Sequence, residues 1–210
     1  QNSAYFMALD TNDIHVQRGL FFPWKLGVSE RLIISDLDSF TKSHEEDIIP
    51  IMKNLVLDYN NVTSLAIAGN SGSGKSYTLT YLLSHLKQIS DLIILDPKFD
   101  TPSRWARENG IAVIHPKRNR SKSDFVSEIN ENLSDCLNLN QQRQEIQYDN
   151  PNQHFDHLTI VIDEVLALSE GVNKTIKDSF FSLMSQIALL GRATKVHLLL
   201  VSQRFDYNTI

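Results

Sequence analysis

Four residues in the first half of the chain have the types and spacing of a phosphate-binding loop. In the stretch GNSGSGKS, Gly69, Gly74, Lys75 and Ser76 match the pattern G-x-x-x-x-G-K-[ST]. In that pattern, backbone N–H groups surround the phosphates, the lysine neutralises their outer oxygens and the hydroxyl ligates Mg²⁺. The predicted nucleotide-binding residues are Gly69, Asn70, Ser71, Gly72, Ser73, Gly74, Lys75, Ser76 and Tyr77, with Ser76 as a metal ligand and Lys75 as a catalytic residue.

The sequence on either side of this loop predicts the elements that position it. Residues 65–68 form a short apolar run typical of a buried parallel strand. After the loop, apolar residues recur at helical spacing: Tyr77, Leu79, Leu82, Leu83 and Leu86. The order strand, loop, helix directs the positive end of the helix dipole at a bound anion.

A second candidate site element is a pair of carboxylates after another apolar run. The stretch LTIVIDE, residues 158–164, ends in Asp163 and Glu164. We expect Asp163 to hold Mg²⁺ through water, and Glu164 to orient and deprotonate the water that attacks the γ-phosphate. The alternative is structural, because an aspartate at a strand end often caps the next helix.

The stretch VHLLLVSQ predicts a strand at 196–201 that ends beside Gln203. NTPases with adjacent carboxylates usually insert one further strand between the phosphate-loop strand and the acidic strand, and this segment supplies it. Gln203 would then emerge at the carboxyl end of the sheet, where α/β proteins bind ligands, and its amide could contact the γ-phosphate. An exposed loop glutamine is an equally good interpretation of the same residue.

Arg192 lies between a predicted helix and that strand. The helix is expected to begin after Asn173, a good N-cap, and to end at Gly191, a good residue just past a helix end. An arginine at a subunit boundary can reach the neighbour's nucleotide and stabilise the charge of the transition state. The plain alternative is a solvated arginine.

Composition limits the possible classes of protein. The chain has 210 residues, 41% hydrophobic and 21% charged, which suits one large α/β domain without a membrane-spanning run. The net charge of -5 argues against a surface that binds nucleic acid all over by bulk electrostatics, so any DNA contact must be local. The single cysteine, Cys136, excludes an internal disulfide and agrees with a cytoplasmic location. The first residues lack a secretory signal, and we expect the chain to be a piece of a longer protein.

Further elements are expected along the chain: strands at 31–36, 92–95 and 112–114, and helices at 48–59, around 103–108 and over the stripe Phe125, Ile129, Leu133, Cys136 and Leu137. The polar segment 138–157 is interpreted as a helix end and a mobile connection, in which His154 and His157 are solvated rather than metal ligands. Alternating strands and helices predict a mainly parallel sheet covered by helices on both faces.

Taken in order, several motifs resemble the FtsK/SpoIIIE branch of the FtsK–HerA translocases. They are the Leu26–Gly27 turn, GNSGSGKS, ILDPK at 94–98, IVIDE at 160–164 and LGRATKVHLLLVSQR at 190–204. The resemblance implies a RecA-like P-loop motor that hydrolyses ATP and assembles as a homo-hexamer. It also implies that the motor moves DNA, usually double-stranded, through the central pore. The residues of these motifs are similar to those of coupling or transfer proteins of Gram-positive mobile elements.

The resemblance also implies a domain division and DNA contacts. Residues 1–60 would form an entry segment with a short strand and a helix, and 61–210 the motor domain, truncated at its carboxyl end. The pore loop would be SEGVNKTIK, so Lys174 and Lys177 are candidates for phosphate contact, against a solvated helix start. For the basic run at 115–122 we favour simple solvation.

Two other functions fit the same residues. A type VII secretion ATPase would move polypeptides with a related motor, and the acidic net charge favours it mildly. A nucleotide-binding regulatory domain would bind but not hydrolyse, although the presence of both Asp163 and Glu164 argues against it.

Overall fold

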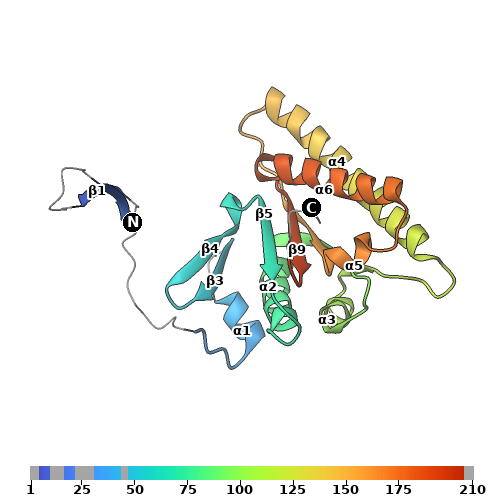
Figure 1. The fold of residues 1–210 in the computed structure, drawn as a ribbon, viewed down its shortest axis with the longest axis horizontal. Coiled ribbons are helices and arrows are strands. Elements are labelled where there is room, and N and C mark those ends of the chain that lie inside the picture. Colours follow the sequence, from blue (N-terminus) through green and yellow to red (C-terminus); the bar gives the residue numbers. More distant parts are fainter. Residues whose placement is uncertain (1–4, 10–16, 22–30, 44–46, 206–210) are drawn as a thin grey trace.

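A computed structural model describes residues 5–9, 17–21, 31–43 and 47–205, the first two stretches as backbone only (Figure 1). Its centre is a five-stranded parallel sheet in the order β5-β9-β8-β6-β7. The elements of this unit are β5 (Ser64–Ala68), α2 (Lys75–Ile89), β6 (Ser90–Leu95), α3 (Thr101–Glu108), β7 (Ala112–Ile114), α4 (Lys122–Asp149), β8 (His157–Ile162), α5 (Val165–Ser169), α6 (Lys174–Thr194) and β9 (Val196–Ser202).

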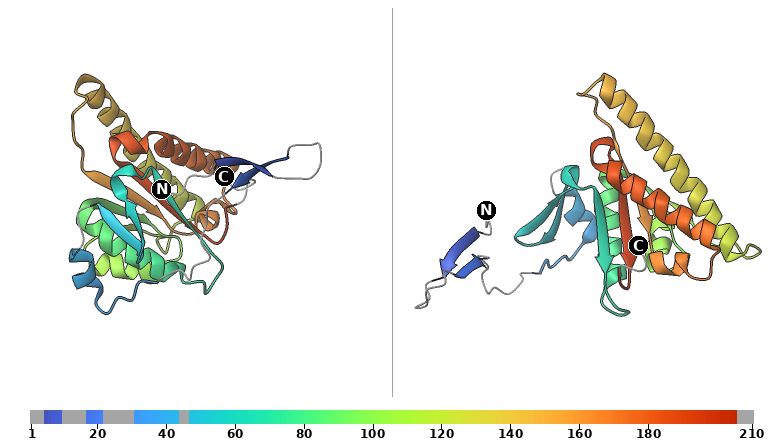
Figure 2. Two further views of the ribbon diagram at one scale, coloured as in Figure 1. Left: turned by 90° about the vertical axis from the view of Figure 1, so that its left-hand side faces the viewer. Right: turned by 45° about the horizontal axis from the view of Figure 1, so that its top comes forward.

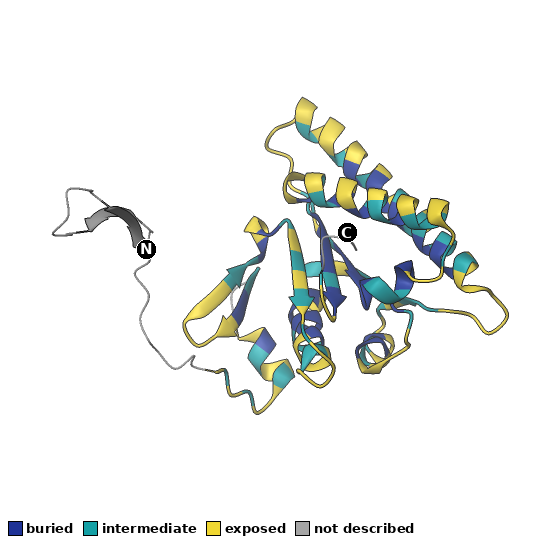
Figure 3. Ribbon diagram, in the orientation of Figure 1, coloured by how far each residue is buried: buried dark blue, intermediate teal, exposed yellow. Residues whose placement is uncertain are grey.

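Side chains alternate between two cores because successive residues of a strand point to opposite faces of the sheet. Along β8, Ile160 and Ile162 join the core under α4, α5 and α6, whereas Val161 joins the core under α2 and α3. Burial is concentrated on the inner faces of these helices, and the outer faces are exposed (Figure 3). The predicted fold, a parallel sheet with helices on both faces, is confirmed.

The strand order also confirms that one strand lies between the phosphate-loop strand and the acidic strand. That strand is β9, which pairs with β5 on one side and with β8 on the other. Because all five strands are parallel, their carboxyl ends lie along one edge of the sheet, which we call the carboxyl edge. The opposite edge, where the strands begin, is called the amino edge.

The segment before the sheet differs from the prediction. Residues 48–59 do not form a helix but a hairpin of β3 (Ile48–Met52) and β4 (Leu55–Asp58), followed by the short 3-10 turn η1 (Tyr59–Asn61). Pro50 disfavours the helical conformation only at Ile49, the residue before it, and the segment is rich in β-branched residues, which favour strands. The two residues between the strands, Lys53 and Asn54, form a tight hairpin connection.

Residues 31–36 were also expected as a strand, and they form none. Asp36 instead caps α1 (Leu37–Lys42) by accepting a hydrogen bond from the Ser39 N–H at 3.1 Å. A separate pair of strands, β1 (Tyr5–Leu9) and β2 (Gln17–Phe21), is antiparallel. The Leu26–Gly27 turn lies outside the described residues.

Two helices run further than predicted. α4 continues through the polar segment to Asp149, and its carboxyl-terminal end extends beyond α6 (Figure 2). Arg143 fastens this part, because its guanidinium donates to the carbonyls of Asp156 and Thr194, each at 2.8 Å. Glutamine, which is frequent in this segment, favours helix, so the expectation of a mobile connection at 138–149 was wrong.

α6 likewise passes Gly191 and ends at Thr194, with Lys195 as its left-handed C-cap at φ 59°. Gly191 is therefore not a helix terminator. A Cβ at this position would lie 2.1 Å from the carbonyl oxygen of Val196, so the absence of a side chain lets α6 pack against β9. Arg192 consequently lies in the last turn of α6 and not past it.

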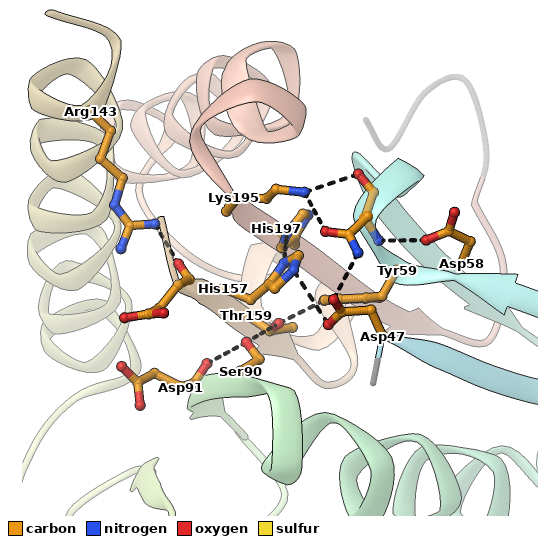
Figure 4. Close-up of polar contacts among 12 residues, drawn as sticks. Asp47, Asp58, Tyr59, Ser90, Asp91, Arg143, His157, Thr159, Lys195 and His197 are labelled. Atoms are coloured by element: carbon orange, nitrogen blue, oxygen red, sulfur yellow. Dashed lines mark hydrogen bonds and ion pairs between the residues drawn. The ribbon is translucent and has the colours of Figure 1, made fainter. Parts of the chain in front are cut away.

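The expectation that His157 is a solvated loop residue was wrong as well. His157 is the first residue of β8, it is buried, and its Nδ1 lies 2.8 Å from Nε2 of His197 on β9 (Figure 4). Tyr59 packs against both imidazoles, and its hydroxyl lies 2.6 Å from Thr159 Oγ1, which in turn is 2.7 Å from Ser90 Oγ. These five side chains, the amino-edge cluster, join η1 to the sheet.

Candidate functional site

The backbone conformation of the loop between β5 and α2 explains why glycines occur in it. Gly72 and Gly74 have φ values of +78° and +94°, a conformation that side-chain-bearing residues rarely adopt. A Cβ at Gly69 would lie 2.5 Å from Ser73 Oγ, so the Ser73 side chain would have to rotate away. The loop is therefore a tight turn whose amides lie close to its surface.

The start of α2 has donors available for an anion. Gly74 is the N-cap residue and supplies no side-chain capping hydrogen bond. The first backbone N–H groups of a helix have no partner within it, and together with the helix dipole they favour a negative ligand. The ammonium of Lys75 lies over the same loop, where it donates to the carbonyls of Gly69 at 2.5 Å and Asn70 at 3.2 Å. A phosphate can replace these carbonyls as the acceptor for the Lys75 ammonium.

Opposite the loop, the ends of β6 and β8 bring three buried carboxylates together: Asp96, Asp163 and Glu164. Burial, reinforced by the negative charges of Asp96 and Glu164, raises the pKa of Asp163 to about 6. Glu164 has a left-handed backbone with φ 51° and is the N-cap of α5, but its side chain makes no capping hydrogen bond. The start of α5 is therefore not capped by a carboxylate side chain, which argues against the structural alternative for this pair.

The three carboxylates have different partners. Asp96 accepts hydrogen bonds from the backbone N–H groups of Lys98 at 2.7 Å and Asp100 at 2.9 Å, and from the hydroxyl of Ser103. It therefore fixes the turn that leads into α3. That turn carries Lys98, whose Nζ lies 2.8 Å from Glu164 Oε1. The motif DPK is recognisable in the sequence, but it predicted no role for this lysine or for Asp96.

A cavity of about 240 Å³ lies between the loop and the carboxylates. Of the predicted site residues, those that line it are Ser71, Gly72, Gly74, Lys75, Ser76, Tyr77, Asp163, Glu164 and Gln203. Lys98, Asp100, Leu79 and Val201 complete the lining. Gly69, Asn70 and Ser73 shape the loop from behind and do not line the cavity.

These residues fit a nucleotide with Mg²⁺. Unpaired amides and two ammonium groups suit phosphate oxygens, whereas the buried carboxylates suit a cation. Among the described residues, no three His, Cys, Asp or Glu side chains form a metal-binding group. Magnesium is commonly held by only one or two protein ligands plus substrate phosphates, so Ser76 and Asp163 with a triphosphate would be sufficient.

The remaining predicted residues lie elsewhere. Arg192 is exposed near the amino edge, with Nη2 3.4 Å from Asn61 Oδ1, so it does not line this cavity. Lys174 is exposed in the first turn of α6, and the ammonium of Lys177 lies 5.7 Å from the centre of the Phe181 ring. Two cations of the basic run, Lys117 and Arg120, form ion pairs with Glu128 at 2.8 and 2.9 Å.

Fold and cavity together define a P-loop NTPase domain. The AAA domain family matches residues 60–207, and the chain belongs to that family. A protein of Bacillus subtilis (strain 168) named FtsK domain-containing protein YdcQ is 24% identical over 169 residues, which cover 77% of this chain and 34% of that protein. The similarity noted in the sequence to the FtsK family is thereby confirmed.

Solved structures show the same fold. The pCW3 conjugation coupling protein TcpA, in a monomer form with ATPgS, has a TM-score of 0.68 and 18% identity, covering 98% of this chain and 61% of that one. The cytoplasmic domain of the type VII secretion ATPase EccC of Thermomonospora curvata has a TM-score of 0.54 and 23% identity, covering 77% of this chain and 22% of that one. The chain thus spans about a third of the curated relative, 61% of the coupling protein and 22% of the secretion ATPase domain. No helix among the described residues is long and apolar enough to cross a membrane.

Proposed function

We propose that this chain is the ATP-hydrolysing motor domain of a ring-forming, cytoplasmic translocase that moves DNA. The observation that carries the proposal is the single cavity in which the loop amides, Lys75 and Ser76 face the buried pair Asp163 and Glu164. Positioning and electrostatics account for most of the catalysis of phosphoryl transfer, and this cavity offers both signs of charge.

The side chains have distinct roles in this proposal. Lys75 leaves the carbonyls of Gly69 and Asn70 to donate to the outer phosphate oxygens, while Ser76 and Asp163 hold the metal ion. When bound, Mg²⁺ offsets the negative charge of the phosphates. Lys98 lies 2.8 Å from Oε1 of Glu164, and Oε2 of the same carboxylate is proposed to orient the attacking water and accept its proton. Gln203 lines the cavity from the end of β9 and is proposed to contact the γ-phosphate.

Arg192 is proposed to act on the nucleotide of a neighbouring subunit. It lies in the turn of α6 that precedes β9, near the amino edge, whereas the cavity of its own chain lies at the carboxyl edge. Only a contact across a subunit boundary would bring it to a phosphate, which is consistent with the proposed homo-hexamer.

DNA is proposed as the transported polymer because the relatives include a conjugation coupling protein and a protein with an FtsK domain. The proposed contacts are Lys174 and Lys177, which lie just after the β8–α5 unit. The second candidate is a polypeptide, favoured by the likeness to a type VII secretion ATPase and by the net charge of -5.

Phosphate release, measured against protein concentration with and without duplex DNA or a peptide substrate, tests the proposal. We expect duplex DNA to raise the rate cooperatively and added salt to weaken that effect, because phosphate contacts release counterions. Lys75→Ala and Glu164→Gln should reduce hydrolysis at least about 100-fold. Matched controls are Lys87→Ala at the far end of α2 and Glu145→Gln on α4, both exposed and away from the cavity.

The outcomes separate the competing functions. Stimulation by the peptide instead of DNA would favour the secretion motor. ATP binding without phosphate release under any of these conditions would contradict a motor and indicate a regulatory nucleotide-binding domain.

A further inference from the structure

Positive charge is concentrated in two loops of the chain, 115–122 and 169–177. Together these loops contain six of the 20 lysines and arginines but only one of the 25 aspartates and glutamates, namely Glu170. The rest of the chain is therefore strongly acidic, whereas the two loops are basic. A confined basic surface on an acidic protein attracts a polyanion to one place and repels it elsewhere.

The structure places these two loops side by side. The first connects β7 with α4, and the second runs from the end of α5 into the first turn of α6. Lys122, the first residue of α4, donates a hydrogen bond to the carbonyl of Glu170 in the second loop. Further along α4, Asn130 Nδ2 donates to the carbonyl of Ile176 at 3.0 Å. The beginnings of α4 and α6 are therefore fastened to each other, although these contacts join residues 48 and 46 positions apart.

The first loop presents its cations to solvent. Glu128 on α4 pairs with Lys117 and Arg120, which holds the loop on the helix, but the side chains of these two cations remain 56% and 49% exposed. Exposed ion pairs are weak, so a phosphate can compete with Glu128 for both cations. Arg118 is exposed as well, and no hydrogen bond or ion pair joins it to another residue that the structure describes.

The second loop adds two cations beside the first. Lys174 is exposed at the start of α6, and Lys177 follows one turn later, with its ammonium 5.7 Å from the centre of the Phe181 ring. Lys122 lies between the two groups of cations, because it belongs to the first loop and bonds to the second. We call the resulting set of side chains the basic surface: Lys117, Arg118, Arg120, Lys122, Lys174 and Lys177.

Few acidic side chains oppose the basic surface. Four lie within the two loops or in the first two turns of the helices that follow them. Glu128 is already paired with two of the cations, and Asp124 accepts a hydrogen bond from the hydroxyl of Ser121 at 2.8 Å. Glu170 and Asp178 are exposed. The cations of the basic surface therefore outnumber the exposed carboxylates beside it.

We propose that the 115–122 loop contacts the phosphate backbone of DNA and that it does so together with the 169–177 loop, as one surface. The proposal rests on the proposed function, because it takes DNA as the transported polymer. It replaces the solvation that the sequence favoured for 115–122, since the sequence does not show that this run adjoins Lys174 and Lys177. Exposed cations gathered on one surface suit a line of phosphates, because each phosphate that they neutralise releases counterions.

The salt dependence of DNA binding by the purified chain tests the proposal. The affinity for a short fluorescein-labelled duplex is measured by anisotropy at several salt concentrations. The slope of the logarithm of the affinity against that of the salt concentration changes by about 0.9 for each phosphate contact. We expect Lys117→Gln with Arg118→Gln to make this slope shallower by about 1 to 2, and Lys174→Gln with Lys177→Gln to do the same. The two changes should add when all four substitutions are combined.

The matched control is Lys42→Gln with Lys87→Gln, which removes the same charge from exposed positions on α1 and α2. It should leave the slope unchanged. Duplexes of different sequence should lose affinity equally in the loop variant, because phosphate contacts carry no sequence information.

Three outcomes would overturn the proposal. The first is a slope for the 115–122 variant equal to that of the control, which would confine the DNA contact to other residues. The second is a loss of affinity for one duplex sequence only, which would assign the loop to the bases. The third is a wild type that binds poly-glutamate more tightly than duplex DNA, which would assign the basic surface to an acidic polypeptide. If the wild type hydrolyses ATP but binds no duplex DNA, the choice of DNA in the proposed function is itself wrong.

Discussion

The two edges of the parallel sheet both carry buried polar side chains, but these side chains have different partners. At the amino edge, Tyr59, Thr159, Ser90 and the two buried histidines hydrogen-bond or stack with one another (Figure 4). At the carboxyl edge, Asp163 and Glu164 are buried beside a third carboxylate, with the half-exposed Lys98 as a cationic partner. Buried polar groups that pair with one another therefore indicate a structural contact. Buried groups of like charge that are left together indicate a binding site.

The same comparison predicts opposite pH dependences. Burial raises the pKa of Asp163 to about 6, so its protonated form is favoured in the folded chain. Burial, followed by the neighbouring His157, lowers the pKa of His197 to about 4, so its neutral form is favoured. Between about pH 4 and 6, acidification therefore stabilises the fold through Asp163 and destabilises it through His197.

The largest expected effect distinguishes Asp96 from its two neighbours at the carboxyl edge. Asp96→Ala removes the acceptor of three hydrogen bonds, so we expect the free energy of unfolding to fall by about 3 kcal/mol or more. Urea denaturation measures this change, and Asp91→Ala, an exposed aspartate on the same strand, is the control. A change as small as that of the control would mean that all three carboxylates belong to the ligand site.

Asp163→Asn tests the carboxyl edge, because we expect this substitution to raise the free energy of unfolding. The ionised carboxylate is disfavoured by burial, so its stabilising protonated form is present below about pH 4 and lost as pH rises through about 6. At pH 7 in EDTA, the variant should be more stable than the wild type by about 2 kcal/mol, although hydrolysis should be lost. A variant less stable than the wild type at pH 7 would show that Asp163 is structural.

His197→Phe tests the amino edge, where we expect the free energy of unfolding to change with pH in the opposite direction. The neutral imidazole of the wild type contributes stability above pH 6.5 that is lost as pH falls toward about 4. Between pH 7 and pH 5 we expect the wild type to lose about 2 kcal/mol through this residue, and the variant to lose correspondingly less. Thermal unfolding at the two pH values measures the difference, and equal losses in both proteins would contradict it.

Tyr59→Phe should have the smallest effect. It removes one hydroxyl from the amino-edge cluster, while Thr159 keeps its contact with Ser90, so about 1 kcal/mol of stability should be lost. The rate of ATP hydrolysis by the folded variant should not change, because this edge lies away from the cavity. If the variant is fully folded and still hydrolyses ATP more slowly than the wild type, the two edges are coupled.

The sequence predicted a mainly parallel sheet because its buried strands are short apolar runs, and it predicted the place of β9 between β5 and β8, but not the rest of the strand order. The prediction from the sequence was wrong where a local pattern is shared by more than one structure. Ile48, Ile49, Met52, Leu55 and Val56 share a helical face, but the segment is rich in β-branched residues and forms two strands. Gly191 is typical of a helix end, but here it permits close packing against β9.

What the sequence determined by itself are the local features: which segments are strands of the sheet, where the loop turns and which residues carry charge. These follow from backbone preferences and from patterns within a few residues. Only the tertiary structure decided which charges meet. Asp96 and Lys98 reach Asp163 and Glu164 because β6 pairs with β8, and His157 is buried because β9 brings His197 to it, pairings between segments far apart in the chain.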